Sequence, residues 1–311
     1  MYENIPFLLS VVFVVLGFVL LAWSSDQFVD GASVTAKALK ISPFIIGMVI
    51  IGFGTSAPEL CVSVMAGISK HSGVSLGNAY GSCIFNIAFI LGIAALIRPL
   101  SVKTSAVYVA GPLLAVISGF SYLLLKDAML SRADAIALLV SFAVVFSIYC
   151  YFDQKKAKSE DVQHVKSASP SASGKVVAAG VFRLVLGLSV LIFSSHILVW
   201  GAVDLARFFK VDDLIIGLTI VAVGTSLPEL ASAVASARRG EHEFVLGNIV
   251  GSNIFNTLAV VGLASFISPV KCFSPHIITR DLPMVIFLSL SISVFSFNIK
   301  GKIIEDLTFF S

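Results

Sequence analysis

Two glutamates lie inside long apolar stretches of this 311-residue chain, where an ionisable side chain is costly. Glu59 ends the sequence GTSAPE at residues 54–59, and Glu229 ends the sequence GTSLPE at residues 224–229. A charged side chain at the centre of a membrane helix costs about 2.5–3.5 kcal/mol on insertion scales, so it marks a functional candidate. The repeated motif therefore predicts that the two acids share one cation site.

The charge of this predicted site limits which cation it would hold. Two neighbouring carboxylates repel each other, and a divalent cation, protons or monovalent cations would relieve that repulsion. Calcium takes about 6–8 oxygen ligands. Two carboxylates and the carbonyls of Thr55 and Thr225 offer six oxygens in all. His and Cys are absent from the motif, which argues against zinc, copper and nickel. Magnesium holds its water too tightly to suit this cage.

A second motif adds polar side chains in each half. GNAYGSCIFN contains Ser82 and Asn86, and GNIVGSNIFN contains Ser252 and Asn256. In each pair the residues are four apart, so they share a helix face. We expect these faces to complete the oxygen cage. The first asparagines of the two motifs, Asn78 and Asn248, are expected to make hydrogen bonds between helices.

Each GTSxPE motif also contains a proline within a predicted helix. Pro58 and Pro228 lack a backbone donor and clash with the carbonyls four residues back, at Gly54 and Gly224. A kink or break is therefore predicted in both helices. Freed carbonyls at membrane depth must be buried in protein or line a wet cavity, and we expect them to face the other half and contact the ion.

The composition predicts an all-α polytopic membrane protein. Apolar residues make up 57% of the chain and charged residues 13%, whereas ordinary globular proteins are about 25% charged. Apolar runs of roughly 20 residues, the length that crosses a bilayer, recur along the chain. The net charge is only +3 and no basic stripe is present, which argues against a nucleic-acid partner. We therefore expect a multi-pass protein of the cell (inner) membrane, surrounded by the lipid bilayer.

The chain is expected to divide into a first repeat (1–152), a cytoplasmic linker (153–175) and a second repeat (176–311). The linker prediction rests on its Lys- and Ser-rich composition. The expected helices span 5–38, 43–68, 74–97, 104–125 and 132–152, then 178–208, 211–237, 242–267 and 276–298. The counterpart of 132–152 would fall near 302–322, so the second repeat is expected to hold four helices plus an incomplete fifth, a truncated tenth helix overall.

The two halves are repeats. A shift of 170 residues aligns 52–100 with 222–270 without a gap, and 19 of those 49 positions are identical. Five helices in the first half place the second half in the opposite orientation, so we expect an inverted-topology repeat with its site near the membrane midplane. With the N-terminus outside, 14 of the 21 Lys and Arg residues fall on the cytoplasmic side, which favours that orientation.

The paired GTS-x-PE and GN-x-x-GS-x-IFN motifs resemble the α-repeats of the cation/calcium exchanger superfamily, specifically those of prokaryotic sodium/calcium exchangers. This resemblance covers residues 24 to about 270. It implies ten helices, exchange of several sodium ions for one calcium ion, and movement of the helices at 5–38 and 178–208 past the rest of the protein.

The resemblance also implies roles for individual residues. Glu59 and Glu229 would bind calcium and also ligate sodium, and the carbonyls of Thr55 and Thr225 would complete the calcium site. Sodium sites would draw on the hydroxyls of Ser56, Ser226, Ser82 and Ser252 and the carbonyls of Gly52 and Ala222, with Asn86 and Asn256 lining the middle of the cage. Some family members, including potassium-dependent exchangers, carry Asp where this chain has Asn256, which argues against potassium dependence.

The function predicted from these observations is secondary antiport of calcium against sodium by alternating access. We expect no enzymatic activity and no cofactor, only calcium and sodium as transported ions, and a monomer is expected to suffice. A proton/calcium antiporter of the same fold remains an alternative. A cation channel with an acidic constriction is a second, and an intramembrane hydrolase that uses the two carboxylates as acid and base is a third.

Overall fold

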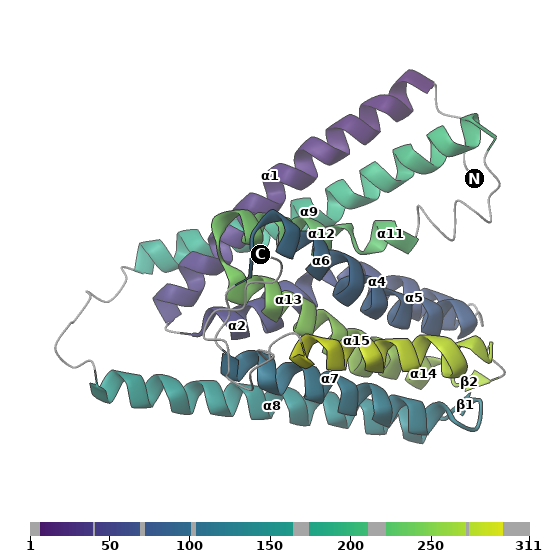
Figure 1. The fold of residues 1–311 in the computed structure, drawn as a ribbon. Coiled ribbons are helices and arrows are strands. Elements are labelled where there is room, and N and C mark those ends of the chain that lie inside the picture. Colours follow the sequence, from purple (N-terminus) through teal and green to yellow (C-terminus); the bar gives the residue numbers. More distant parts are fainter. Residues whose placement is uncertain are drawn as a thin grey trace.

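The structure, a computed structural model, describes residues 7–39, 41–68, 72–100, 104–163, 174–210, 222–271 and 274–294. Helices dominate these residues (Figure 1). Five of the described helices are long and apolar enough to cross a membrane, and a bent pair, Pro43–Thr55 with Ala57–Ile68, makes a sixth if it counts as one span. The predicted all-α membrane class is therefore confirmed.

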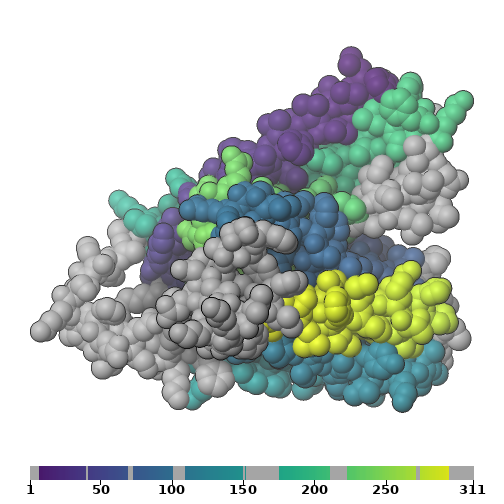
Figure 2. Space-filling view, viewed as in Figure 1, coloured from purple at the N-terminus to yellow at the C-terminus, as the bar shows by residue number. Residues whose placement is uncertain are grey.

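The longest helices, α1 (Phe7–Leu39) and α9 (Gly174–Phe208), pack side by side in opposite directions. They stand out as a ridge along one side of the molecule (Figures 1 and 2). A Cβ added at Gly17 would lie 2.8 Å from the backbone of Leu198, and one at Gly187 would lie 2.5 Å from that of Phe28. These two contacts exchange under the 170-residue shift. The pair is therefore related by a pseudo-twofold axis, and small residues allow its close approach.

Several short helices and two long ones complete the first half. Segments labelled η are π-helical, with a wider turn than an α-helix. The first-half elements are α2 (Pro43–Ile46), η1 (Gly47–Gly52), α3 (Phe53–Thr55), α4 (Ala57–Ile68), α5 (Ser72–Phe85), η2 (Asn86–Ile90), α6 (Leu91–Ile97), α7 (Thr104–Leu125) and α8 (Arg132–Gln163).

The second half repeats much of this order. Its described elements after α9 are α11 (Ala222–Thr225), α12 (Leu227–Arg239), α13 (His242–Ile254), η4 (Phe255–Val260), α14 (Val261–Ile267), η5 (Ile277–Asp281) and α15 (Leu282–Val294). Two short strands, β1 (Met129–Leu130) and β2 (Val270–Lys271), pair antiparallel and join a loop of each half.

Helix α13 forms the centre of the core, with every residue from Phe244 to Ile254 buried. It packs against α2 and η1 of the other half at backbone contact distance. A Cβ at Gly247 would lie 2.4 Å from the carbonyl oxygen of Phe44, and one at Gly251 would lie 2.1 Å from that of Met48. Because only glycine lacks a Cβ, these two positions let the halves approach closely. On one side of this core lie α7, α8 and α15, and on the other the α1–α9 pair (Figure 1).

Some predicted boundaries differ from the structure. Helix α8 continues to Gln163, so residues 153–163 of the predicted linker are helical, and α9 already begins at Gly174. The prediction had ended the helix where charged residues begin, although Lys and Glu are good helix formers. Part of the predicted helix at 211–237 and the predicted incomplete tenth helix lie outside the described residues.

Candidate cation site

Both GTSxPE motifs interrupt a helix. Ser56 separates α3 from α4, and Ser226 separates α11 from α12. Their backbone angles, φ −82° and ψ 10° at Ser56 and φ −92° and ψ 10° at Ser226, lie outside the α-helical region. The axis of the first broken helix bends by 44°. The break predicted from Pro58 and Pro228 is confirmed.

The break places opposite helix ends close together. Glu59 lies in the first turn of α4 and Glu229 in the first turn of α12, where the partial positive charge of a helix N-terminus stabilises a carboxylate. The C-terminal ends of α3 and α11 lie one residue before the N-terminal ends of α4 and α12, and a helix C-terminus carries a partial negative charge on its last carbonyl groups. Carboxylates and carbonyl oxygens therefore meet at both breaks, an arrangement that attracts a cation.

Two reciprocal hydrogen bonds connect the motifs. Ser56 Oγ donates to Glu229 Oε1 over 2.7 Å, and Ser226 Oγ donates to Glu59 Oε1 over 2.9 Å. The two bonds exchange under the 170-residue shift, and both glutamates are buried, at 0% and 1% exposure. The residues of both motifs thus meet in one buried place.

Several buried polar atoms of the predicted site residues have no hydrogen-bond partner among the described residues. They are Oε2 of Glu59, Oε2 of Glu229, Oδ1 of Asn86, and Oδ1 and Nδ2 of Asn256. Leaving a buried acceptor unsatisfied costs about 1–3 kcal/mol, and more for a charged group. A cation among these oxygens would remove that cost. Most of these unpartnered atoms are carboxylate and amide oxygens, a ligand type that favours a hard cation such as calcium or sodium.

Ser82 of the second motif lies at the same place, and the two asparagines of this motif lie in π-helical segments. Ser82 Oγ is 3.3 Å from Ser226 Oγ. Asn86 begins η2 and Asn256 lies in η4. Wider π-helical turns change the direction of side chains and are frequent at functional sites. The helices predicted at 74–97 and 242–267 are confirmed, but the sequence pattern alone does not show that each contains a π-helical segment.

The predicted backbone ligands also lie at these breaks. The carbonyl of Gly52 accepts a hydrogen bond from Ser252 Oγ over 3.0 Å, so these two predicted sodium ligands are neighbours. Thr55 Oγ1 donates to the carbonyl of Ile51 over 2.9 Å, and Thr55 is the last residue of α3, so its own carbonyl lies at the break. Thr225 is buried at the end of α11, and Ala222, described by its backbone alone, begins that helix.

Asparagines next to the site hold the glutamate backbones. Asn78 Nδ2 donates to the carbonyl of Glu59 over 3.1 Å and to Ser63 Oγ. Asn248 Nδ2 donates to the carbonyl of Glu229 over 3.3 Å and to Ser232 Oγ. The expected hydrogen bonds between helices are confirmed for both asparagines.

Sequence reasoning missed one polar residue, Asn253, whose side chain contacts Asn86. The only signal in the sequence is the variable position of GSxIFN, where the first half has Cys83 and the second half has this asparagine. If both halves carried the same residue at this position, the sequence would give no reason to single it out.

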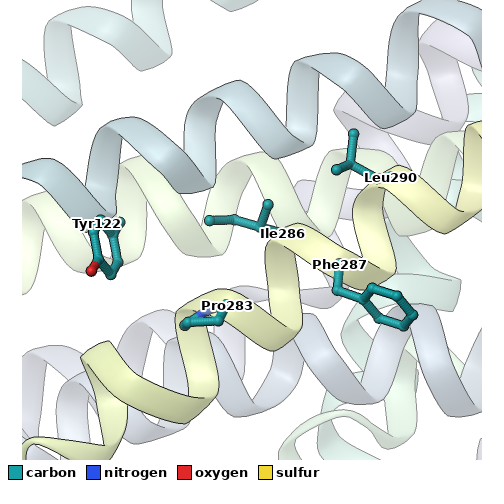
Figure 3. A pocket seen from close by; sticks show the side chains of 5 residues that line it. All are labelled: Tyr122, Pro283, Ile286, Phe287 and Leu290. Carbon is teal, nitrogen blue, oxygen red and sulfur yellow. The ribbon is translucent and has the colours of Figure 1, made fainter.

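An apolar recess lies away from this site, between α7 and α15 (Figure 3). Its volume is about 400 Å³, and it is lined by Tyr122, Pro283, Ile286, Phe287 and Leu290. Because its lining carries no carboxylate or carboxamide, it does not suit a cation. The two glutamates therefore remain the candidate site.

Comparison with known proteins places these features in a family. Residues 9–151 and 179–303 match the family described as "Sodium/calcium exchanger protein". The putative antiporter CaxA of Alkalimonas amylolytica is 42% identical over 262 residues, which are 84% of this chain and 82% of CaxA. The sodium/calcium exchanger MaX1 of Methanosarcina acetivorans is 30% identical over an alignment of 317 positions, gaps included, which covers 88% of this chain and 89% of MaX1.

A solved structure has the same fold. The sodium-calcium exchanger NCX_Mj, soaked with 2.5 mM Na⁺ and 1 mM Sr²⁺, superposes with a TM-score of 0.80 at 30% identity, covering 92% of this chain and 90% of NCX_Mj. The family match spans both halves and the relatives align over most of their length. The chain therefore belongs to the sodium/calcium exchanger protein family, whose solved member NCX_Mj shares its all-α membrane fold.

Proposed function

We propose that this protein is a secondary active antiporter that exchanges calcium for sodium by alternating access, at a site centred on Glu59 and Glu229. The observation that carries the proposal is the reciprocal pair of serine–carboxylate hydrogen bonds. These bonds leave one buried oxygen of each carboxylate without a partner among the described residues. The relatives MaX1 and NCX_Mj, which are both described as sodium/calcium exchangers, support the choice of ions.

Calcium would bind between the two carboxylates. Its double charge balances both glutamates, and the helix ends at α3 and α11 add the carbonyls of Thr55 and Thr225. Together these groups offer six oxygens, the lower end of calcium's usual range of about 6–8. Asn86 and Asn256 would line the middle of the cage, where their buried amide oxygens have no partner among the described residues.

Sodium would bind at neighbouring positions that share the same carboxylates. The proposed ligands are Ser56, Ser226, Ser82, Ser252, and the carbonyls of Gly52 and Ala222. Because calcium and sodium need the same negative charge, the two ions exclude each other. That competition couples their movement, since each ion shifts the conformational equilibrium only through its different affinity for the two states.

The moving element would be the α1–α9 pair. These two helices pack far more extensively on each other than on the core and project from it (Figures 1 and 2). A rigid pair of this kind can slide along the core and expose the site alternately on the two sides of the membrane.

Flux measurements in proteoliposomes test the proposal. An outward sodium gradient should drive uptake of ⁴⁵Ca²⁺, and Glu59→Gln and Glu229→Gln should each abolish it. Glu243→Gln, a matched change in the first turn of α13, should leave uptake intact. If either site variant exchanges calcium normally, the role assigned to that glutamate is wrong.

The same vesicles separate the alternatives. Uptake driven equally well by a pH gradient without sodium would indicate a proton/calcium antiporter. Calcium flux that needs no counter-ion and does not saturate would indicate a channel. Saturable uptake that requires sodium on the opposite side supports the proposal.

Orientation and assembly are also part of the proposal: an N-terminus outside, in the inner membrane, with a monomer sufficient for transport. The inner membrane protein YrbG of Escherichia coli, 36% identical over 288 residues, supports the location. A cysteine placed at Lys126, in the exposed loop between α7 and α8, should then react with a membrane-impermeant thiol reagent added from outside. Labelling only from the cytoplasmic side would indicate the opposite orientation, with the N-terminus inside.

A further inference from the structure

One pair of equivalent positions near the site does not obey the repeat. Asn253 in α13 corresponds to Cys83 in α5 under the 170-residue shift, whereas Asn86 and Asn256 correspond to each other and are identical. All four residues are buried, at 1% exposure or less. The difference between Asn253 and Cys83 therefore gives the two equivalent asparagines different surroundings.

A chain of hydrogen bonds sets the direction of the Asn86 amide. Asn253 Nδ2 donates to the backbone carbonyl of Cys83 over 3.4 Å, and Asn253 Oδ1 accepts from Asn86 Nδ2 over 3.1 Å. A backbone carbonyl can only accept, so it requires the NH₂ group of Asn253 on its side. The oxygen of Asn253 then faces Asn86, which must present its own NH₂ group. The oxygen of Asn86 is left over, buried and without a hydrogen-bond partner among the described residues.

Among the described residues, Asn256 has no equivalent series of hydrogen bonds. Cys83 Sγ lies 3.8 Å from the carbonyl of Asn253 and 3.5 Å from Thr257 Oγ1, and it offers no amide. Neither Oδ1 nor Nδ2 of Asn256 has a partner within the described part of the chain. No hydrogen bond within the described residues therefore sets the direction of the Asn256 amide, while that of Asn86 is held.

We propose that Asn253 is a positioning residue that holds the amide oxygen of Asn86 toward the transported cation, so that the two halves supply one held and one adaptable amide ligand. This inference rests on the proposed calcium site between Glu59 and Glu229. Holding a ligand in its binding orientation removes the cost of ordering it when the ion arrives. Partners that orient a ligand in this way typically contribute about 10–100-fold to metal affinity.

The variant Asn253→Cys tests the proposal, because the protein already accommodates cysteine at the equivalent position 83. It should raise the half-saturating calcium concentration of exchange on the order of tenfold, with a smaller change in the maximal rate. Asn86→Ala should raise it at least as much. In the Asn86→Ala background, Asn253→Cys should add nothing, since its effect passes through Asn86.

Two outcomes overturn the proposal: unchanged calcium affinity in Asn253→Cys, or an equal further loss when both changes are combined. Purified protein is first checked by size-exclusion chromatography and thermal unfolding. If Asn253→Cys does not fold, Asn253→Ser takes its place, because a serine side chain is too short to hold the Asn86 amide. Glu59→Gln, measured in parallel, separates a failure of the proposed function from a failure of the positioning role. If Glu59→Gln still exchanges calcium, the proposed function fails; if only Asn253→Cys behaves as the unchanged protein, the positioning role alone fails.

Discussion

Ser226 is the N-cap residue of α12, yet its hydroxyl donates to Glu59, 167 residues away in the sequence, over 2.9 Å. The sequence SLPE at 226–229 has the form of a capping box, in which the serine would bond a backbone N–H of its own helix. No such cap bond forms. A buried carboxylate requires a donor more than a helix end does, because hydrogen bonds to charged groups are the stronger ones.

Replacing this serine should weaken calcium binding. Ser226→Ala removes the donor that orients the Glu59 carboxylate. Because a hydrogen bond to a charged group contributes about 1.5–3 kcal/mol, we expect a loss in calcium affinity of roughly tenfold to a hundredfold, measured by isothermal titration calorimetry. Ser189→Ala, which removes an exposed bond to the carbonyl of Val185 in α9, is the control. An unchanged affinity in Ser226→Ala would show that the bond does not help to form the site.

Calcium should stabilise the folded protein through Glu229. At a calcium concentration of 100 times the dissociation constant, the expected gain is about 2.7 kcal/mol in the free energy of unfolding. The gain appears as a higher melting temperature in a thermal-shift assay. Glu229→Gln should abolish the shift and Glu243→Gln should keep it. A full calcium shift in Glu229→Gln would exclude Glu229 as a ligand.

Contact between α1 and α9 should not tolerate a methyl group at Gly31. A Cβ there would lie 2.4 Å from the backbone nitrogen of Leu184, and a backbone atom cannot turn aside as a side chain can. Gly31→Ala is expected to cost about 1–3 kcal/mol, the usual range for overpacking, and to lower the melting temperature.

Gly92→Ala is the matched control for that measurement. A Cβ at Gly92 in α6 meets no described atom within 4 Å, and alanine favours helix over glycine by up to about 1 kcal/mol. Its melting temperature should therefore stay equal or rise. If both alanine variants melt alike, close packing at Gly31 does not limit stability.

An ion-pair cluster at one end of the α1–α9 ridge ties it to the core. Arg239 at the end of α12 pairs with Asp30 of α1 over 2.9 Å, and Asp30 also pairs with Arg183 of α9 over 2.8 Å. Because these side chains are partly exposed, Arg239→Gln should change the unfolding free energy by only about 0–1 kcal/mol. Deuterium exchange in the second half of α1 should nevertheless become faster.

Arg280→Gln provides the comparison, since Arg280 pairs only with its sequence neighbour Asp281 among the described residues. It should leave exchange in α1 unchanged. Equal protection of α1 in Arg239→Gln and the unchanged protein would mean that the Asp30 pair does not hold the ridge against the core.

The local chemistry of the site could be predicted from particular residues. Pro58 and Pro228 each lack a donor and clash with the preceding turn, so a break was predictable wherever the helices lay in space. The two glutamates were identifiable because a charge in an apolar run requires compensation. The helix ends around 153–175 were less predictable, because Lys and Glu continue a helix as readily as they form a solvated linker.

Contacts between the halves depended on the tertiary structure. Ser226 could as well have capped its own helix, and nothing in the local sequence places its hydroxyl on Glu59. Asn253 likewise became visible only when its amide was seen between the carbonyl of Cys83 and the amide of Asn86.

By itself, the sequence determined which groups the site contains and that they occur twice: residue identity and spacing specify donors, acceptors, helix breaks and the apolar spans that a bilayer requires. Only the tertiary structure decided which half satisfies which oxygen. The physical reason is that a buried polar atom takes the nearest good donor in space, and proximity across the pseudo-twofold axis comes from helix packing and cannot be read from distance along the chain.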